Sequence, residues 1–64
     1  PDLFIATPRG KYHGCYVEMK NGKKGKVSDN QKERMTQLTK EGYLCLVCHD
    51  FEEFERDTDN YMSL

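Results

Sequence analysis

Apolar residues fall into three short runs along the chain. Residues 2–6 (DLFIA) are apolar up to a Thr-Pro pair, residues 15–20 (CYVEMK) alternate between the two faces of a strand, and residues 43–48 (YLCLVC) are apolar without a break. Runs of this length that are bounded by Gly, Pro and Asn predict β-strands. The unbroken third run predicts the central strand of a sheet.

The second and third strands are separated by a predicted helix. Ser28 and Gln31 fit a capping box, in which the serine caps the amide three residues on and the glutamine reaches back. Met35 and Leu38 mark an inner apolar stripe, and Gly42 ends the helix at its expected place.

A second, short helix follows the third strand, because Asp50 and Glu53 repeat the capping pattern ahead of further apolar residues. The predicted order is therefore β-β-α-β-α, an α/β fold with a small mixed sheet flanked by helices. A chain of 64 residues forms one domain, over residues 1–64.

The first two strands are expected to form an antiparallel hairpin around Arg9–Lys11. Partners would then have residue numbers that sum to about 22, within the uncertainty of the loop. Asp2 would lie near Glu18 and Lys20, which share one face of the second strand because side chains alternate with a period of two.

Two carboxylates and a lysine at one end of a sheet have two interpretations. Close carboxylates repel unless a cation lies between them, and oxygen ligands suit Mg²⁺ or Mn²⁺. Such an ion polarises a phosphodiester and activates a bound water, while a lysine beside it stabilises the developing charge. The alternative is an ion pair between side chains on an exposed strand, which contributes little to stability.

Further motifs make this set more specific. Pro1-Asp2, with Glu18-Met19-Lys20 on the next predicted strand, forms a PD…ExK pattern, followed by a Lys/Gly-rich loop, a Ser-x-x-Gln helix start and a Gly-ended helix before an apolar strand. Over residues 1 to about 50 this ordered set resembles the virus-type replication-repair nuclease (VRR-NUC) domain of the PD-(D/E)XK nuclease superfamily. The resemblance implies the restriction-endonuclease-like core fold.

The resemblance also implies roles for individual residues. Asp2, Glu18 and the backbone carbonyl of Met19 would be metal ligands, and Lys20 would be the catalytic lysine. Gln31 matches the family's helix glutamine beside the metal, and the capping box is an equally good local explanation of it. Family members carry a further acidic residue on a preceding helix, so we expect such a helix to be missing here or supplied by a separate segment.

Charge is unevenly distributed along the chain. Residues 1–40 carry nine Lys or Arg against four Asp or Glu, whereas residues 41–64 carry one against seven. The basic half can attract a phosphate backbone, although a solvated lysine-rich turn explains it equally well. The candidate DNA contacts are Arg9, Lys11, Lys23, Lys24 and Lys26.

The segment Cys45–His49 (CLVCH) matches the attachment motif of c-type haem, but its context excludes haem. The motif lies inside a predicted strand, where a spacing of three sends the two sulfurs to opposite faces. Cys15, Cys45, Cys48 and His49 could also be considered as zinc ligands. Common structural zinc sites, however, have two pairs of closely spaced ligands, each pair on its own turn, and this sequence lacks the second pair. We therefore expect three reduced, largely buried thiols.

These features predict an Mg²⁺- or Mn²⁺-dependent DNA nuclease. The resemblance implies action on branched or flapped DNA in repair, replication or recombination, by a homodimer in the cytoplasm of a bacterial or phage-infected cell. No apolar run is long enough to cross a membrane. The alternative is a non-catalytic DNA-binding module that keeps the fold with an incomplete metal site.

Overall fold

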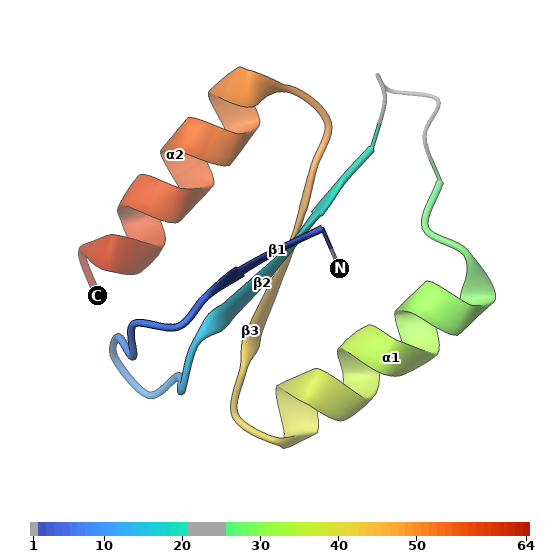
Figure 1. Cartoon of the computed structure of the whole chain (residues 1–64), viewed down its shortest axis with the longest axis horizontal. Helices are drawn as coiled ribbons and strands as arrows, with labels where there is room; N and C mark the ends of the chain where they lie inside the picture. The colour runs from blue at the N-terminus through green and yellow to red at the C-terminus, as the bar shows by residue number, and fades with distance from the viewer. Residues whose placement is uncertain (1, 21–25) are drawn as a thin grey trace.

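The computed structural model describes residues 2–20 and 26–64 and contains five elements in the predicted order β-β-α-β-α. They are β1 (Leu3–Ile5), β2 (Cys15–Met19), α1 (Asp29–Lys40), β3 (Leu44–Cys48) and α2 (Phe51–Met62). The helices lie on opposite sides of the small mixed sheet (Figure 1). The predicted fold class is confirmed.

The strand order is β1-β2-β3, so β2 is central among the described strands. β1 pairs with β2 antiparallel, and β3 pairs with β2 parallel through the α1 crossover. The prediction that residues 43–48 form the central strand is therefore wrong. Its unbroken apolar character has another cause, because α1 and α2 both pack against β3 and cover its two faces.

The hairpin between β1 and β2 has a slightly different register from the predicted one. Leu3 pairs with Val17 and Ile5 with Cys15, so paired residue numbers sum to 20 rather than about 22. The loop causes part of the difference. Arg9 and Tyr12 form an isolated antiparallel bridge, and their residue numbers sum to 21. The pairing register therefore shifts by one residue between the turn and the strands.

Both predicted signals for α1 are present. The Ser28 side chain accepts from the Gln31 amide, and the Gln31 side chain accepts from the Ser28 amide, which completes the capping box. The helix ends just before Gly42, whose φ of +95° is the left-handed conformation that favours glycine. A Cβ there would also collide with the imidazole ring of His13.

The second helix is as long as the first, so the prediction of a short helix is wrong. Asp50 caps it by accepting from the Glu53 amide at 2.8 Å, but the Glu53 carboxylate accepts from the His49 amide rather than returning to Asp50. Its last turn is held by long-range contacts. Tyr61 is buried and donates to the carbonyl of Thr7 at 2.6 Å, a partner that local sequence does not indicate.

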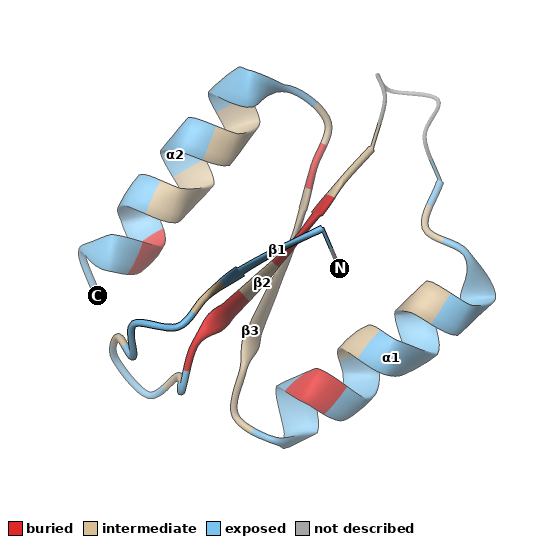
Figure 2. Ribbon diagram, in the orientation of Figure 1, coloured by how far each residue is buried: buried red, intermediate tan, exposed pale blue. Residues whose placement is uncertain are grey.

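The core lies between the sheet and α2, where the fully buried residues are Cys15, Val17, Cys48 and Tyr61. Figure 2 shows the buried positions concentrated on the sheet, with only isolated ones on the helices. All three cysteines are free. Cys45 points its sulfur to the Met35 carbonyl of α1, whereas Cys48 points to Asp57 of α2, which confirms the predicted opposite faces.

Neither helix of the described chain has the length and apolar character that a membrane-spanning segment needs.

Candidate functional site

Glu18 and Lys20 extend from the end of β2 on the face covered by α1. Glu18 is only 9% exposed, an unusual degree of burial for a carboxylate. The Lys20 ammonium lies 3.4 Å from Glu18 Oε1. An ion pair withdrawn from water in this way differs from the exposed surface pair that the sequence left open, because a buried charge requires partners.

Gln31 connects this pair to α1. Its Nε2 donates to Glu18 Oε1 at 2.5 Å, and its Oε1 accepts from Lys20 Nζ at 2.7 Å. The same Oε1 accepts from the Ser28 amide at 3.0 Å. One side chain therefore closes the capping box and also orients both charged groups. The two interpretations of Gln31 that the sequence left open are compatible.

Asp2 lies at the same end of the sheet. Its amide donates to the Val17 carbonyl at 2.9 Å, and its Oδ2 accepts from the Met19 amide at 2.7 Å. The hairpin therefore brings Asp2 to the Glu18–Lys20 end of β2, in spite of the changed register. A carboxylate has about four lone-pair sites, so the bond to Met19 leaves acceptor capacity for another partner.

The backbone of Met19 faces the same edge. Lys20 donates its amide to the Cys48 carbonyl on the β3 side, whereas Met19 directs its amide to Asp2 on the β1 side. Because the amide and carbonyl of one strand residue point the same way, the Met19 carbonyl also faces the β1 edge. Asp2, Glu18 and the Met19 carbonyl, all at this end of the sheet, could provide oxygen ligands of the kind that Mg²⁺ or Mn²⁺ prefers.

Residues 2–20 and 26–64 contain no group of three or more His, Cys, Asp or Glu side chains arranged to hold a metal ion. Within these residues, a metal at this site would be bound by Asp2, Glu18, backbone oxygen and water. Mg²⁺ suits such a site, because it retains several of its waters in protein complexes.

The candidate DNA contacts are distributed unevenly. Arg9 and Lys11 belong to the hairpin turn, at the opposite end of β2 from Glu18. Arg9 donates from Nε to the Met62 carbonyl at 3.1 Å, and the Lys11 ammonium lies over the Tyr12 ring at 5.6 Å. The turn thus contributes to packing against α2, and a role in DNA contact stays a prediction.

Of the three candidate DNA contacts in the loop between β2 and α1, only Lys26 is described, and it is exposed. Lys23 and Lys24 lie outside the described residues.

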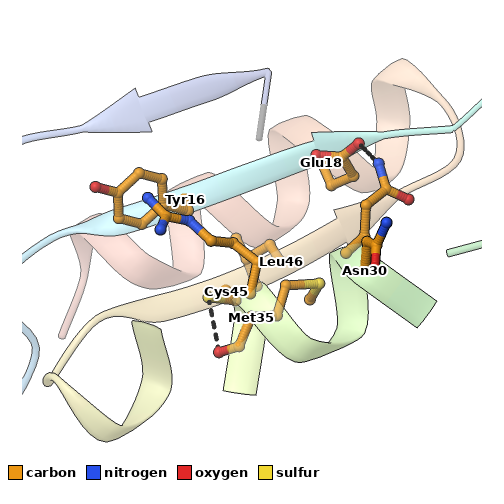
Figure 3. Close-up of a pocket in the computed structure, with 8 residues that line it drawn as sticks. Tyr16, Glu18, Asn30, Met35, Cys45 and Leu46 are labelled. Carbon is orange, nitrogen blue, oxygen red and sulfur yellow. Dashed lines mark hydrogen bonds between the residues drawn. The ribbon is translucent and has the colours of Figure 1, made fainter. Parts of the chain in front are cut away.

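An apolar pocket of about 160 Å³ adjoins the buried pair between α1 and the sheet. Its lining includes Tyr16, Glu18, Asn30, Arg34, Met35 and Cys45. In Figure 3, Tyr16 and Glu18 lie at the two ends of the pocket, with Met35 and Cys45 between them. Burial raises the pKa of the Cys45 thiol, so the thiol is protonated at neutral pH.

The sequence analysis did not identify Asn30 and Arg34 as site residues. A signal was present, because they are four residues apart and Asn30 immediately precedes Gln31. Residues at this spacing share one helix face. The signal could be used only after Gln31 had been placed beside Glu18.

The VRR-NUC domain family matches residues 1–51. A solved structure titled "VRR_NUC domain protein" is 36% identical and superimposes with a TM-score of 0.95 over 100% of this chain. This chain spans about half of that protein, 52% of its length. No curated protein matches. The family match covers most of the chain and includes Asp2, Glu18 and Lys20, so the chain belongs to the VRR-NUC domain family.

Proposed function

We propose that this chain is the catalytic core of an Mg²⁺- or Mn²⁺-dependent DNA nuclease that hydrolyses phosphodiester bonds. Membership of the VRR-NUC domain family implies a nuclease-type function. The observation that supports a catalytic site is the buried cluster of Glu18, Lys20 and Gln31, whose polar groups are hydrogen-bonded to one another. Charged side chains that are buried beside a pocket are more typical of a functional site than of the protein surface.

Asp2, Glu18 and the Met19 carbonyl would hold the ion at the end of β2. When bound, such an ion polarises the phosphodiester and lowers the pKa of a bound water. The hydrogen bond from the Met19 amide fixes one oxygen of Asp2, so the carboxylate is oriented before the ion binds. Burial of Glu18 limits its motion in the same way.

Lys20 supplies positive charge beside the position of the phosphate. Its ammonium can stabilise the charge that develops on the phosphate oxygens and orient the attacking water. Gln31 accepts a hydrogen bond from that ammonium through Oε1 and donates one to Glu18 through Nε2, so one side chain positions both charged groups. Gln31 is itself held in place, because it also takes part in the capping box at the start of α1.

We further propose branched or flapped DNA as the substrate and a homodimer as the active form. A single copy measures 31 × 26 × 13 Å, and Arg9 and Lys11 lie at the far end of β2 from Glu18. One copy therefore offers a short basic surface around its cluster. Two copies would provide two sites and a longer surface, which suits DNA with more than one duplex arm.

The test is cleavage of a branched DNA by the intact protein, with and without Mg²⁺. Lys20→Ala should reduce turnover at least about a hundredfold, because charge stabilisation of this kind is worth that much. Lys40→Ala removes the same charge from the last turn of α1 and should retain activity. Lys40→Ala should unfold at nearly the wild-type temperature, whereas Lys20→Ala leaves the buried Glu18 with one partner fewer and should unfold at a lower temperature. Turnover is therefore compared per folded molecule.

Wild-type turnover in a folded Lys20→Ala variant would overturn the catalytic assignment. A wild-type protein that binds branched DNA without cleaving it in Mg²⁺ or Mn²⁺ would instead support the DNA-binding module.

A further inference from the structure

The apolar pocket beside Glu18 has the size of a single ring. Its volume is about 160 Å³, and a protein cavity on the order of 150 Å³ holds one benzene ring. Drug-sized ligands occupy pockets of roughly 300 Å³ or more. The pocket therefore fits a pyrimidine better than a two-ring purine.

Its walls are suited to a flat aromatic ligand. Tyr16 stacks on Phe4 with ring centroids 4.5 Å apart and meets Tyr43 edge-on at 5.3 Å, so its ring is held in place. Met35 contributes a polarizable thioether to the same lining. A fixed aromatic ring and a thioether can stabilise the face of any stacked base, so a choice between pyrimidine and purine would come from the size of the pocket.

The rim provides polar groups that the fold does not use. Asn30 and Arg34 are exposed residues of α1, and no hydrogen bond or ion pair within the described chain involves either side chain. The amide of Asn30 carries a donor and an acceptor, as the edge of a base does. The guanidinium of Arg34 matches a phosphate in geometry and charge.

The pocket is continuous with the proposed cleavage site. Tyr16 and Glu18 are two residues apart on the same face of β2, which corresponds to about 7 Å along a strand. Glu18 belongs both to the buried cluster and to the pocket wall. A nucleotide whose phosphate lies at Glu18 can therefore place its base, or that of its neighbour, in the pocket.

We propose that this pocket binds the unpaired base of a nucleotide next to the cleaved phosphate, with a pyrimidine preferred over a purine and Arg34 contacting a flanking phosphate. The proposal rests on the proposed nuclease function. A base leaves a duplex at a cost of a few kcal/mol, and least where it is already unpaired. The pocket thus accounts for cleavage at branch points and flaps, where unpaired bases are available.

The first experiment measures cleavage by the intact protein of flap substrates that carry an abasic site at each position around the cut. One position should raise KM about tenfold or more, with a smaller change in kcat, because stacking contributes to binding. A purine at that position should have an intermediate effect. Equal KM values for base and abasic site at every position would overturn the proposal.

Variants of the rim test the residues. Arg34→Ala should raise KM for all substrates, and Asn30→Ala should reduce the difference between a pyrimidine and an abasic site. Lys40→Ala is the matched control for lost charge on α1 and should change neither. Asn30 and Arg34 are exposed, so thermal unfolding should be unchanged in both variants.

A second readout does not require cleavage. A flap that carries 4-thiothymine, a photo-cross-linking thymine analogue, is bound in Ca²⁺ and irradiated, and the cross-linked peptide is identified by mass spectrometry. A cross-link to Tyr16 or Met35 would support the pocket even if the wild-type protein cleaved no DNA, and only the nuclease proposal would then fail. Cross-links confined to other segments would overturn the pocket.

Discussion

Gln31, in the first turn of α1, donates its side-chain amide to the carboxylate of Glu18 on β2, thirteen residues away in sequence. This bond ties the start of a helix to the end of a strand. Because the same side chain also completes the capping box with Ser28, the geometry of the buried cluster depends on the geometry of the helix start.

The first prediction separates the two roles of Gln31. Ser28→Ala and Gln31→Ala both break the capping box, and loss of a cap costs about 1 kcal/mol, so both should lower the unfolding temperature. Only Gln31→Ala also removes the bonds to Glu18 and Lys20. Cleavage per folded molecule should therefore fall in Gln31→Ala and stay near wild type in Ser28→Ala. Equal activity in both variants would show that Gln31 only caps the helix and does not position Glu18 and Lys20 for cleavage.

The parts of the fold that were predictable depend on short-range patterns. The capping box at Ser28, the helix end before Gly42 and the opposite faces of Cys45 and Cys48 follow from spacing within a few residues. The shared face of Glu18 and Lys20 follows from strand periodicity in the same way.

The parts that were not predictable depend on packing between distant segments. An apolar run such as Leu44–Cys48 indicates that both faces are covered, but not whether the strand is central. The full length of α2 depends on Tyr61, whose partner Thr7 is 54 residues away. The pocket rim at Arg34 likewise became visible only after α1 had been placed against β2.

The second prediction concerns the charge of Glu18. Glu18→Gln keeps the shape of the side chain but removes the charge that a divalent ion requires, so Mn²⁺ affinity and cleavage should fall together. In contrast, Lys20→Ala should lose cleavage and keep Mn²⁺ binding. Calorimetric Mn²⁺ titrations of both variants provide the measurement. Unchanged Mn²⁺ affinity in a folded Glu18→Gln variant would remove Glu18 from the ligand set.

The third prediction assigns Arg9 to stability. Its Nε donates to the Met62 carbonyl in the last turn of α2, where a positive charge also interacts favourably with the helix dipole. Arg9→Ala should therefore lower the free energy of unfolding by about 1 kcal/mol. Lys11→Ala, in the same turn, should change it much less. If Arg9→Ala instead weakened DNA binding at unchanged stability, the turn would be a DNA contact.

The last prediction uses the buried thiol of Cys15. Burial first, and then the neighbouring Cys45 and Cys48 thiols, raise the pKa of Cys15 from 9.0 to about 11. Between these pH values the folded state retains a proton that the unfolded chain has lost, so stability should fall as pH rises from about 9 to about 11. A shift of this size corresponds to roughly 2–3 kcal/mol. The measurement is the difference in urea stability between wild type and Cys15→Ala at pH 8 and at pH 10.5, which separates the contribution of Cys15 from the contributions of all other groups. The wild-type protein should lose more stability over this interval, and parallel losses would show that Cys15 contributes nothing to the pH dependence.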